Sequence, residues 1–295
     1  MAPGIDEKVA GAPKGTATQD FVDPGIVPIP KISGDWTVDK VLATVEADKP
    51  EEGSDSPLPY FHLLERLKTT KREGWRRFKI DRGESIADHM YRMAMMSMLA
   101  PPALAPRLDL NKCMKMCLIH DMAESLVGDI TPVDGVPKPE KARREASTMD
   151  YITSTLLGKT YGSSSGGATA DGSATGPLGK LVGEDIRAIW QEYEDSKTLE
   201  SKYVHDIDKM ELLCQMVEYE KRCEGKLDLG EFAYVASRME LPETIAWGQE
   251  VLREREAFWA SKAGGGKHLR GESKVAGGVE ATKVAMQDAY YTKEN

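Results

Sequence analysis

The sequence is short of cysteines and of long apolar runs, and each shortage excludes a class of protein. Its 295 residues include 4 cysteines and no CxxC pair, so we expect neither a zinc knuckle nor a disulfide framework. Reduced thiols are typical of a cytoplasmic or nuclear protein. No segment approaches the ~18 apolar residues of a membrane span, and residues 1–15 resemble neither a secretory signal nor a transit peptide. We expect an intracellular protein with no membrane partner.

An excess of positive charge is also missing. The chain carries 39 basic and 48 acidic residues, which gives a formal net charge of −9. This balance argues against binding of a nucleic acid polymer, because such surfaces are strongly basic. It still permits a local basic pocket for a small phosphate compound.

Three segments are too poor in large apolar residues to form a core. Residues 1–56 are rich in Pro, Gly and charged residues, residues 159–178 are mostly Gly, Ser, Ala and Thr, and residues 263–295 have a similar composition. Such segments bury too little apolar surface to offset chain entropy. We predict a disordered N-terminal arm over 1–56 with one short amphipathic helix at 39–47. One folded domain then spans 57–262 with a flexible insertion at 159–178, and a flexible tail covers 263–295.

The folded part is predicted to be all-α. Apolar residues recur at helical spacing in each of its ordered stretches. The predicted helices cover residues 58–67, 85–99, 110–127, 140–157, 178–194, 199–224 and 242–262.

The chemically richest stretch is 117–131, CLIHDMAESLVGDIT. Residues 110–127 contain no Gly or Pro, so we predict one continuous helix in which His120 and Glu124 share a face. Gly128 ends this helix, and Asp129 follows it. The adjacent His120 and Asp121 offer an imidazole nitrogen and a carboxylate oxygen, a set that suits a divalent metal. The alternative is that this pair makes a hydrogen bond inside the helix and holds no metal.

Further ligands must come from other helices. His89 lies near the beginning of the predicted helix 85–99, as either a ligand or a structural histidine. Asp206 and Asp208 stand about 200° apart on a helix, so at most one can face a shared site. Asp206 has basic neighbours one turn away on both sides, which is typical of a solvated face. Asp208 is therefore the candidate ligand, with capping of a neighbouring helix as its alternative role, and His205 is a weaker candidate for a supporting position.

The order His89, His120–Asp121, Asp208 resembles the H…HD…D pattern of the HD-domain metal-dependent phosphohydrolases. The stretches 84–94, 118–132 and 204–211 are similar to the HD domain-containing protein 2 family of eukaryotes, which is itself similar to the bacterial YfbR 5′-deoxynucleotidases. The resemblance covers residues 57–262 apart from the insertion. It implies an HD-domain helical bundle and a homodimer.

Carried over residue by residue, the resemblance implies one divalent metal, Co²⁺, Mn²⁺ or Mg²⁺, and two catalytic carboxylates. The implied metal ligands are His89, His120, Asp121 and Asp208, and the implied catalytic residues are Glu124 and Asp129.

The resemblance also points to substrate contacts. Trp75, which the sequence alone allows to stack on a base or to fill the core, matches a tryptophan at the family's nucleotide site. The bacterial enzymes place a phosphate-binding arginine immediately before that tryptophan, where this chain has Gly74. Arg76 is a candidate replacement, as are Lys71, Arg72 and Arg77.

The implied activity is hydrolysis of deoxynucleoside 5′-monophosphates to deoxynucleoside and phosphate. The metal would neutralise phosphate oxygens and lower the pKa of a bound water. Glu124 would orient or deprotonate that water, and Asp129 would position it or assist the leaving oxygen. Two alternatives stay open: an HD-type phosphohydrolase for a different nucleotide, and a catalytically silent scaffold that the metal stabilises.

Overall fold

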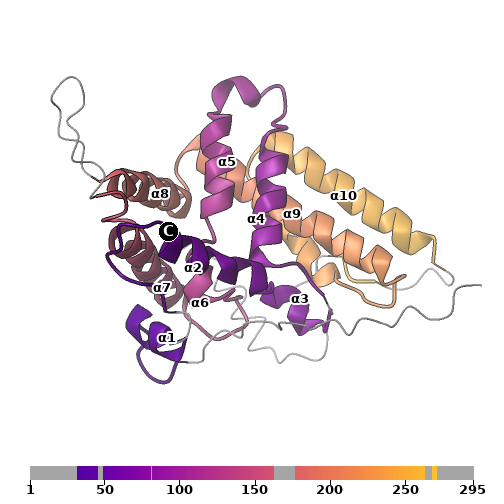
Figure 1. Cartoon of the computed structure of the whole chain (residues 1–295). Helices are drawn as coiled ribbons and strands as arrows, with labels where there is room; N and C mark the ends of the chain where they lie inside the picture. The colour runs from indigo at the N-terminus through magenta and orange to yellow at the C-terminus, as the bar shows by residue number, and fades with distance from the viewer. Residues whose placement is uncertain (1–31, 46–48, 81, 163–176, 263–267, 271–295) are drawn as a thin grey trace, which may run out of the picture.

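The computed structural model of the chain describes residues 32–45, 49–80, 82–162, 177–262 and 268–270 (Figure 1). Within them every regular element is a helix, apart from an isolated bridge between Lys71 and Ser85. The predicted all-α fold is thus confirmed. Residues 1–31, 163–176 and 271–295, which fall in the segments predicted to be flexible, lie outside the described residues.

The described residues form α-helices and a few shorter helical turns. In chain order they are α1 (Val38–Thr44), α2 (Leu58–Thr69), α3 (Glu73–Arg77), α4 (Ile86–Ser97), η2 (Ala105–Arg107), α5 (Leu110–Ile119), α6 (Glu124–Val127), α7 (Lys138–Asp150), the π-helical turn η3 (Tyr151–Leu156), α8 (Leu178–Asp195), α9 (Leu199–Arg222), η4 (Gly230–Arg238) and α10 (Pro242–Ala260).

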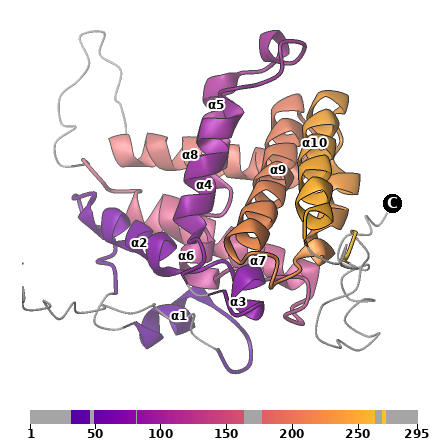
Figure 2. The same cartoon turned by 90° about the vertical axis from the view of Figure 1, so that its right-hand side faces the viewer.

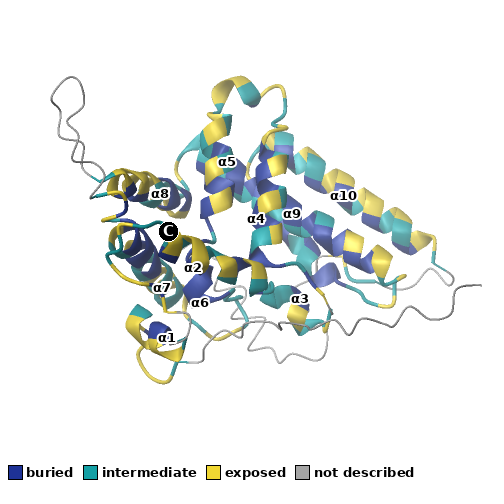
Figure 3. Cartoon of the chain, in the orientation of Figure 1, coloured by how far each residue is buried: buried dark blue, intermediate teal, exposed yellow. Residues whose placement is uncertain are grey.

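Helices α4, α5 and α9 form the centre of the fold. Each packs against the other two, and α10 packs on α9 away from α5 (Figure 1 and Figure 2). Helix α8 contacts α5 and α9, while α6 contacts both α2 and α7. Buried positions lie along the facing sides of these helices (Figure 3). Side chains on the inner faces of α4, α5 and α9 can therefore meet, although their sequence positions are far apart.

The start of α4 is fixed by a capping box. The Ser85 hydroxyl accepts the Asp88 N–H at 3.1 Å, and the Asp88 carboxylate accepts the Ser85 N–H at 2.8 Å. These two bonds satisfy backbone donors that have no partner within the helix. They place His89 in the first turn of α4, on its buried side.

The predicted continuous helix over 110–127 is wrong. Helix α5 ends at Ile119, the chain turns through 120–123, and the short helix α6 follows. In this turn the N–H of Met122 bonds the carbonyl of Ile119, and the N–H of Glu124 bonds the carbonyl of Asp121. These i→i−3 bonds tighten the backbone without any Gly or Pro. His120 and Glu124 are therefore not on the face of one regular helix.

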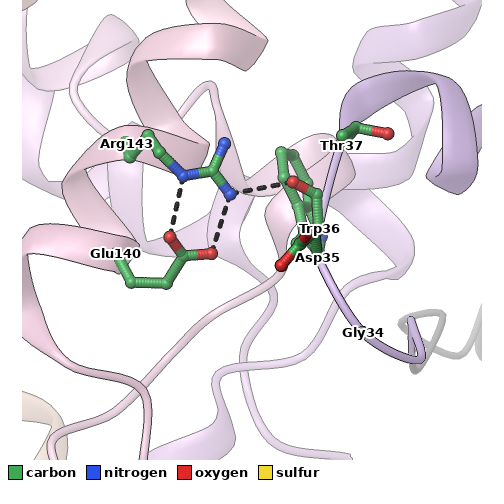
Figure 4. Close-up of a pocket in the computed structure, with 6 residues that line it drawn as sticks. All are labelled: Gly34, Asp35, Trp36, Thr37, Glu140 and Arg143. Atoms are coloured by element: carbon green, nitrogen blue, oxygen red, sulfur yellow. Dashed lines mark hydrogen bonds and ion pairs between the residues drawn. The ribbon is translucent and has the colours of Figure 1, made fainter.

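The folded part begins earlier than the predicted boundary at residue 57. Trp36 is 4% exposed, and Val41 and Leu42 of α1 are fully buried. These side chains pack on α7, beside a cleft of about 350 Å³ where Arg143 donates to the Trp36 carbonyl and to Glu140 (Figure 4). The composition of residues 1–56 is poor in apolar residues on average, so it did not reveal that Trp36 and the helix predicted at 39–47 pack into the core. No helix in the described part of the chain has the length and apolar character needed to cross a membrane.

Candidate metal centre

Three elements bring the predicted metal ligands together. His89 lies on α4, His120 and Asp121 lie in the turn after α5, and Asp208 lies on α9. His89 Nε2 is 3.2 Å from Asp208 Oδ1 and 3.9 Å from Asp121 Oδ2, and His120 Nε2 is 3.1 Å from Asp121 Oδ2. Ligand atoms of His89, His120 and Asp208 all lie within 4.8 Å of one another. Two imidazole nitrogens and two carboxylates thus converge on one point.

The contacts of the two histidine rings fit a metal at this point. His89 is fully buried, and its Nε2 makes no hydrogen bond, although Asp208 Oδ1 lies 3.2 Å away. His120 uses its Nδ1 to bond the carbonyl of Cys117 at 3.0 Å, which turns its Nε2 toward Asp121. A buried polar atom without a partner is costly, and coordination of a cation would satisfy it. The residues present therefore suit a divalent ion with nitrogen and oxygen ligands.

Glu211 supports this cluster, and the sequence reasoning gave it no role. Its Oε2 lies 2.7 Å from His89 Nδ1, and Arg92 Nε donates to its Oε1 at 2.7 Å. Burial and the Arg72 charge lower the pKa of His89, but Glu211 and Asp208 outweigh them and raise it to about 10. A carboxylate behind a ligand histidine fixes the orientation of its ring. The signal for Glu211 in the sequence was its position three residues after Asp208, which places the two side chains on the same side of a helix.

Arg72 is the basic residue that the structure places at the cluster. Its Nη1 lies 3.3 Å from Asp121 Oδ2, and only 14% of its side chain is exposed. Burial lowers the pKa of Arg72, but Asp129, Asp121, Asp208 and Glu124 together raise it well above its usual value. Arg76, the candidate named from the sequence, is half exposed and pairs with Glu73 instead.

The two predicted catalytic carboxylates lie beside the cluster in different settings. Glu124 is 2% exposed, and its Oε2 has no hydrogen-bond partner. Burial, followed by the charges of Asp121 and Asp129, raises the pKa of Glu124 well above its usual value. Asp129 Oδ2 accepts the backbone N–H of Glu73, the first residue of α3, at 2.6 Å. Asp129 thereby holds the segment that carries Arg72.

Trp75 lies in the core. It is 2% exposed, its ring centroid is 4.8 Å from that of Phe232 and 5.3 Å from that of Tyr219, and its Nε1 donates to Glu84 at 2.7 Å. This packing favours the interpretation of Trp75 as a core residue over an open stacking platform. Through Glu84, which directly precedes the cap of α4, the ring supports the helix that carries His89.

The basic neighbours of Asp206 suggested a solvated face, but the structure places this residue in the interior. It is fully buried, accepts the N–H groups of Glu240 and Leu241 at 2.9 Å each, and accepts the hydroxyl of Thr244 at 2.6 Å. The carboxylate that holds a neighbouring helix start is thus Asp206, at α10, while Asp208 faces the metal cluster. The reason is that α10 covers this side of α9, which spacing along α9 alone cannot reveal.

His205 lies behind the cluster. Its ring stacks on Tyr193 at 3.9 Å, and Tyr193 in turn lies 4.9 Å from the ring of His120. Burial, together with the Lys209 charge, lowers the pKa of His205 to about 4. A neutral His205 therefore packs on Tyr193, which in turn contacts the predicted metal ligand His120.

Proteins of known family resemble this chain over most of its length. The family described as HD domain matches residues 64–244. The 5′-deoxynucleotidase hdd1 of Schizosaccharomyces pombe is 42% identical over 207 residues, 70% of this chain and 93% of that protein. The 5′-deoxynucleotidase HDDC2 of Homo sapiens is 34% identical over 217 residues, 72% of this chain and 92% of that protein. The solved structure of the HD domain-containing protein YGK1 has a TM-score of 0.54 at 29% identity, covering 77% of this chain and 100% of that one.

Proposed function

The chain belongs to the HD-domain family, and we propose that it is a metal-dependent 5′-deoxynucleotidase, a phosphoric monoester hydrolase of nucleotide metabolism. The observation that carries this proposal is that ligand atoms of His89, His120 and Asp208 lie within 4.8 Å of one another, with Asp121 Oδ2 beside both imidazoles. The similar proteins of fission yeast and human are named 5′-deoxynucleotidases.

His89, His120, Asp121 and Asp208 would hold one divalent ion, Co²⁺, Mn²⁺ or Mg²⁺. When bound, the ion supplies positive charge for the phosphate and a water of lowered pKa. The two carboxylates formally balance the charge of a divalent ion, so the net positive charge that attracts a phosphate dianion comes from Arg72 beside the site. A candidate general base beside the four ligands suits a catalytic ion better than a purely structural one.

Arg72 binds the phosphate in this proposal. Its guanidinium is buried beside Asp121 and has two planar edges that match phosphate oxygens. Asp129 fixes the backbone immediately after Arg72 and so keeps the guanidinium in place. Arg72 would compensate for Gly74, where the bacterial enzymes have their arginine.

Glu124 acts on the attacking water. Its buried carboxylate has an oxygen, Oε2, with no hydrogen-bond partner, which can orient a water and take its proton as the phosphorus–oxygen bond forms. Asp129 would position the attacking water or assist the leaving 5′-oxygen. As the bond from phosphorus to that oxygen breaks, the oxygen takes up a proton, either the one that Glu124 received or one from solvent, which gives deoxynucleoside and inorganic phosphate.

We further propose a homodimer that resides in the cytoplasm or nucleus. The exposed side of α4 and its C-terminal end carries large apolar side chains at helical spacing, opposite His89. They are Tyr91 at 65%, Met95 at 46%, Met98 at 44% and Leu99 at 76% exposure. Such a stripe on one helix suits contact with a second copy.

The test measures phosphate release from dAMP, dCMP and TMP beside AMP, with each of the three metals. We expect turnover of the deoxynucleotides to exceed that of AMP, and Asp121→Ala to abolish metal retention while helical content survives. No turnover with any metal, or AMP as the faster substrate, contradicts the proposal.

Two arginine variants decide the phosphate contact. Arg72→Met should raise KM by about tenfold or more, because a hydrogen bond to a charged group contributes ~1.5–3 kcal/mol and 1.4 kcal/mol is a factor of ten. Arg76→Met should leave KM close to the wild-type value if Arg72 binds the phosphate. The reverse ranking would assign the contact to Arg76.

A further inference from the structure

Lys141 is a basic residue at the site that neither the sequence motif nor the proposed mechanism uses. It lies in the first turns of α7, and its side chain is 19% exposed. Its Nζ is 3.9 Å from Glu124 Oε1 and 3.5 Å from Glu145 Oε1. Two carboxyl groups thus face this ammonium, one from α6 and one from α7.

The two oxygens of Glu124 differ in their surroundings. Oε1 is the one near Lys141, whereas Oε2 is buried and has no hydrogen-bond partner. At 3.9 Å the ammonium is too far for a hydrogen bond, but its charge favours the orientation that keeps Oε1 on the α7 side, and this orientation sets the direction of Oε2. The general base of a hydrolase needs such a defined direction, since proton transfer requires hydrogen-bond geometry to the attacking water.

We infer that Lys141 is a positioning residue for Glu124: it holds Oε1 between α6 and α7 and so directs Oε2 at the attacking water. This inference rests on the proposed function, because it assigns the support of that function's general base. Glu145 completes the arrangement, since at 3.5 Å it keeps the ammonium on the α7 side. Lys141 makes no contact with substrate in this role.

The kinetic experiment is a double-mutant cycle of Lys141→Met and Glu124→Gln on the full chain loaded with metal. Lys141→Met should lower kcat about tenfold or more, part of the roughly 10²–10⁴-fold that general acid–base catalysis contributes. KM and metal content should stay near wild type, and Lys141→Arg should restore part of kcat. In the Glu124→Gln background, Lys141→Met should change kcat by less than about twofold, because the two residues act as one unit.

A matched control is Lys180→Met. Lys180 is 61% exposed and pairs only with Glu184 of its own helix among the ion pairs of the described residues, so this variant should keep wild-type kcat and KM. A rise in KM from Lys141→Met that persists in the Glu124→Gln background would overturn the inference, because it would place Lys141 on the substrate phosphate. An unchanged kcat in Lys141→Met would overturn it as well.

A second readout does not depend on nucleotidase activity. Thermal unfolding of the same four proteins, with metal removed by a chelator, measures the coupling between Lys141 and Glu124. We expect the shifts in midpoint to be non-additive, with the double variant more stable than the sum of the singles predicts. Additive shifts would overturn the inference even if the enzyme is active. Coupled shifts in a protein without turnover would instead contradict the proposed function and remove the catalytic role assigned to Lys141.

Discussion

Two aspartates that lie two positions apart on α9 should fail in opposite ways when they are removed. Asp206 is fully buried and accepts two backbone N–H groups and one hydroxyl at the start of α10, whereas Asp208 lies 3.2 Å from His89 Nε2. We predict that Asp206→Ala destabilises the fold and spares the metal centre. Asp208→Asn should do the reverse.

The magnitude follows from the bonds that Asp206 makes. A hydrogen bond to a charged group contributes ~1.5–3 kcal/mol, and donors left buried without a partner add a desolvation cost. Three such donors depend on Asp206, whereas Lys209 Nζ, 3.5 Å away, would lose this ion pair but keep its hydrogen bond to the His205 carbonyl. Because such terms are not additive, we expect a loss of about 3–5 kcal/mol in the free energy of unfolding, as for other broken buried pairs. For a folded part of about 200 residues this is a fall in Tm of roughly 6–20 °C.

The assay is thermal unfolding followed by circular dichroism, with a chelator present so that metal binding does not add to stability. Metal content is measured separately on the folded proteins. Asp208→Asn should lose the metal with a smaller change in Tm than Asp206→Ala. A Tm for Asp206→Ala within about 2 °C of wild type would refute the capping role. Metal loss from folded Asp206→Ala, with retention in Asp208→Asn, would refute the assignment of the two residues.

Two further predictions concern the support of the metal centre and of the N-terminal segment. Glu211→Gln removes the charge behind His89 and should weaken metal affinity about 10–100-fold, as for other residues that orient ligand histidines. The control is Glu218→Gln, which changes another partner of Arg92, 46% exposed, and should bind metal normally. Equal metal affinities for the two variants would contradict the role of Glu211. Trp36→Ala should lower the free energy of unfolding by about 3–5 kcal/mol, the usual loss for a buried tryptophan, because the ring is 4% exposed in the core beside α7. An unchanged urea unfolding curve would show that residues 32–45 do not stabilise the domain.

The helices were predictable because their signals are local. Apolar spacing predicted α2, α4, α8, α9 and α10 close to where they lie, and it predicted the start of α5 but not its end. The break after Ile119 carried no such signal, because it depends on i→i−3 bonds within a stretch that contains neither Gly nor Pro. The burial of Trp36 likewise depends on α7, about 100 residues further along the chain.

The candidate ligands were predictable from the order of residue types, but their supports were not. His89, His120, Asp121 and Asp208 follow a motif, and the structure brings them together from three elements. Arg72, by contrast, was one basic residue among several, and its position follows from the bond between Asp129 and the backbone of Glu73. The role of Asp206 at the start of α10 was also invisible, since the residues that bond it lie 34–38 positions away.

The carboxylates around this centre differ in how many of their oxygens have protein partners. This number distinguishes the carboxylates that stabilise the fold from those that can act on a ligand. Both oxygens of Asp206 accept backbone or hydroxyl donors, so nothing remains for a ligand. Glu211 gives one oxygen to Arg92 and the other to His89, and therefore acts through the histidine. Oε1 of Glu124 lies 3.9 Å from Lys141 Nζ, whereas its Oε2 has no hydrogen-bond partner among the described protein groups. Because a buried oxygen without a partner is costly, its presence in Glu124 indicates a group that is completed only when water or substrate arrives.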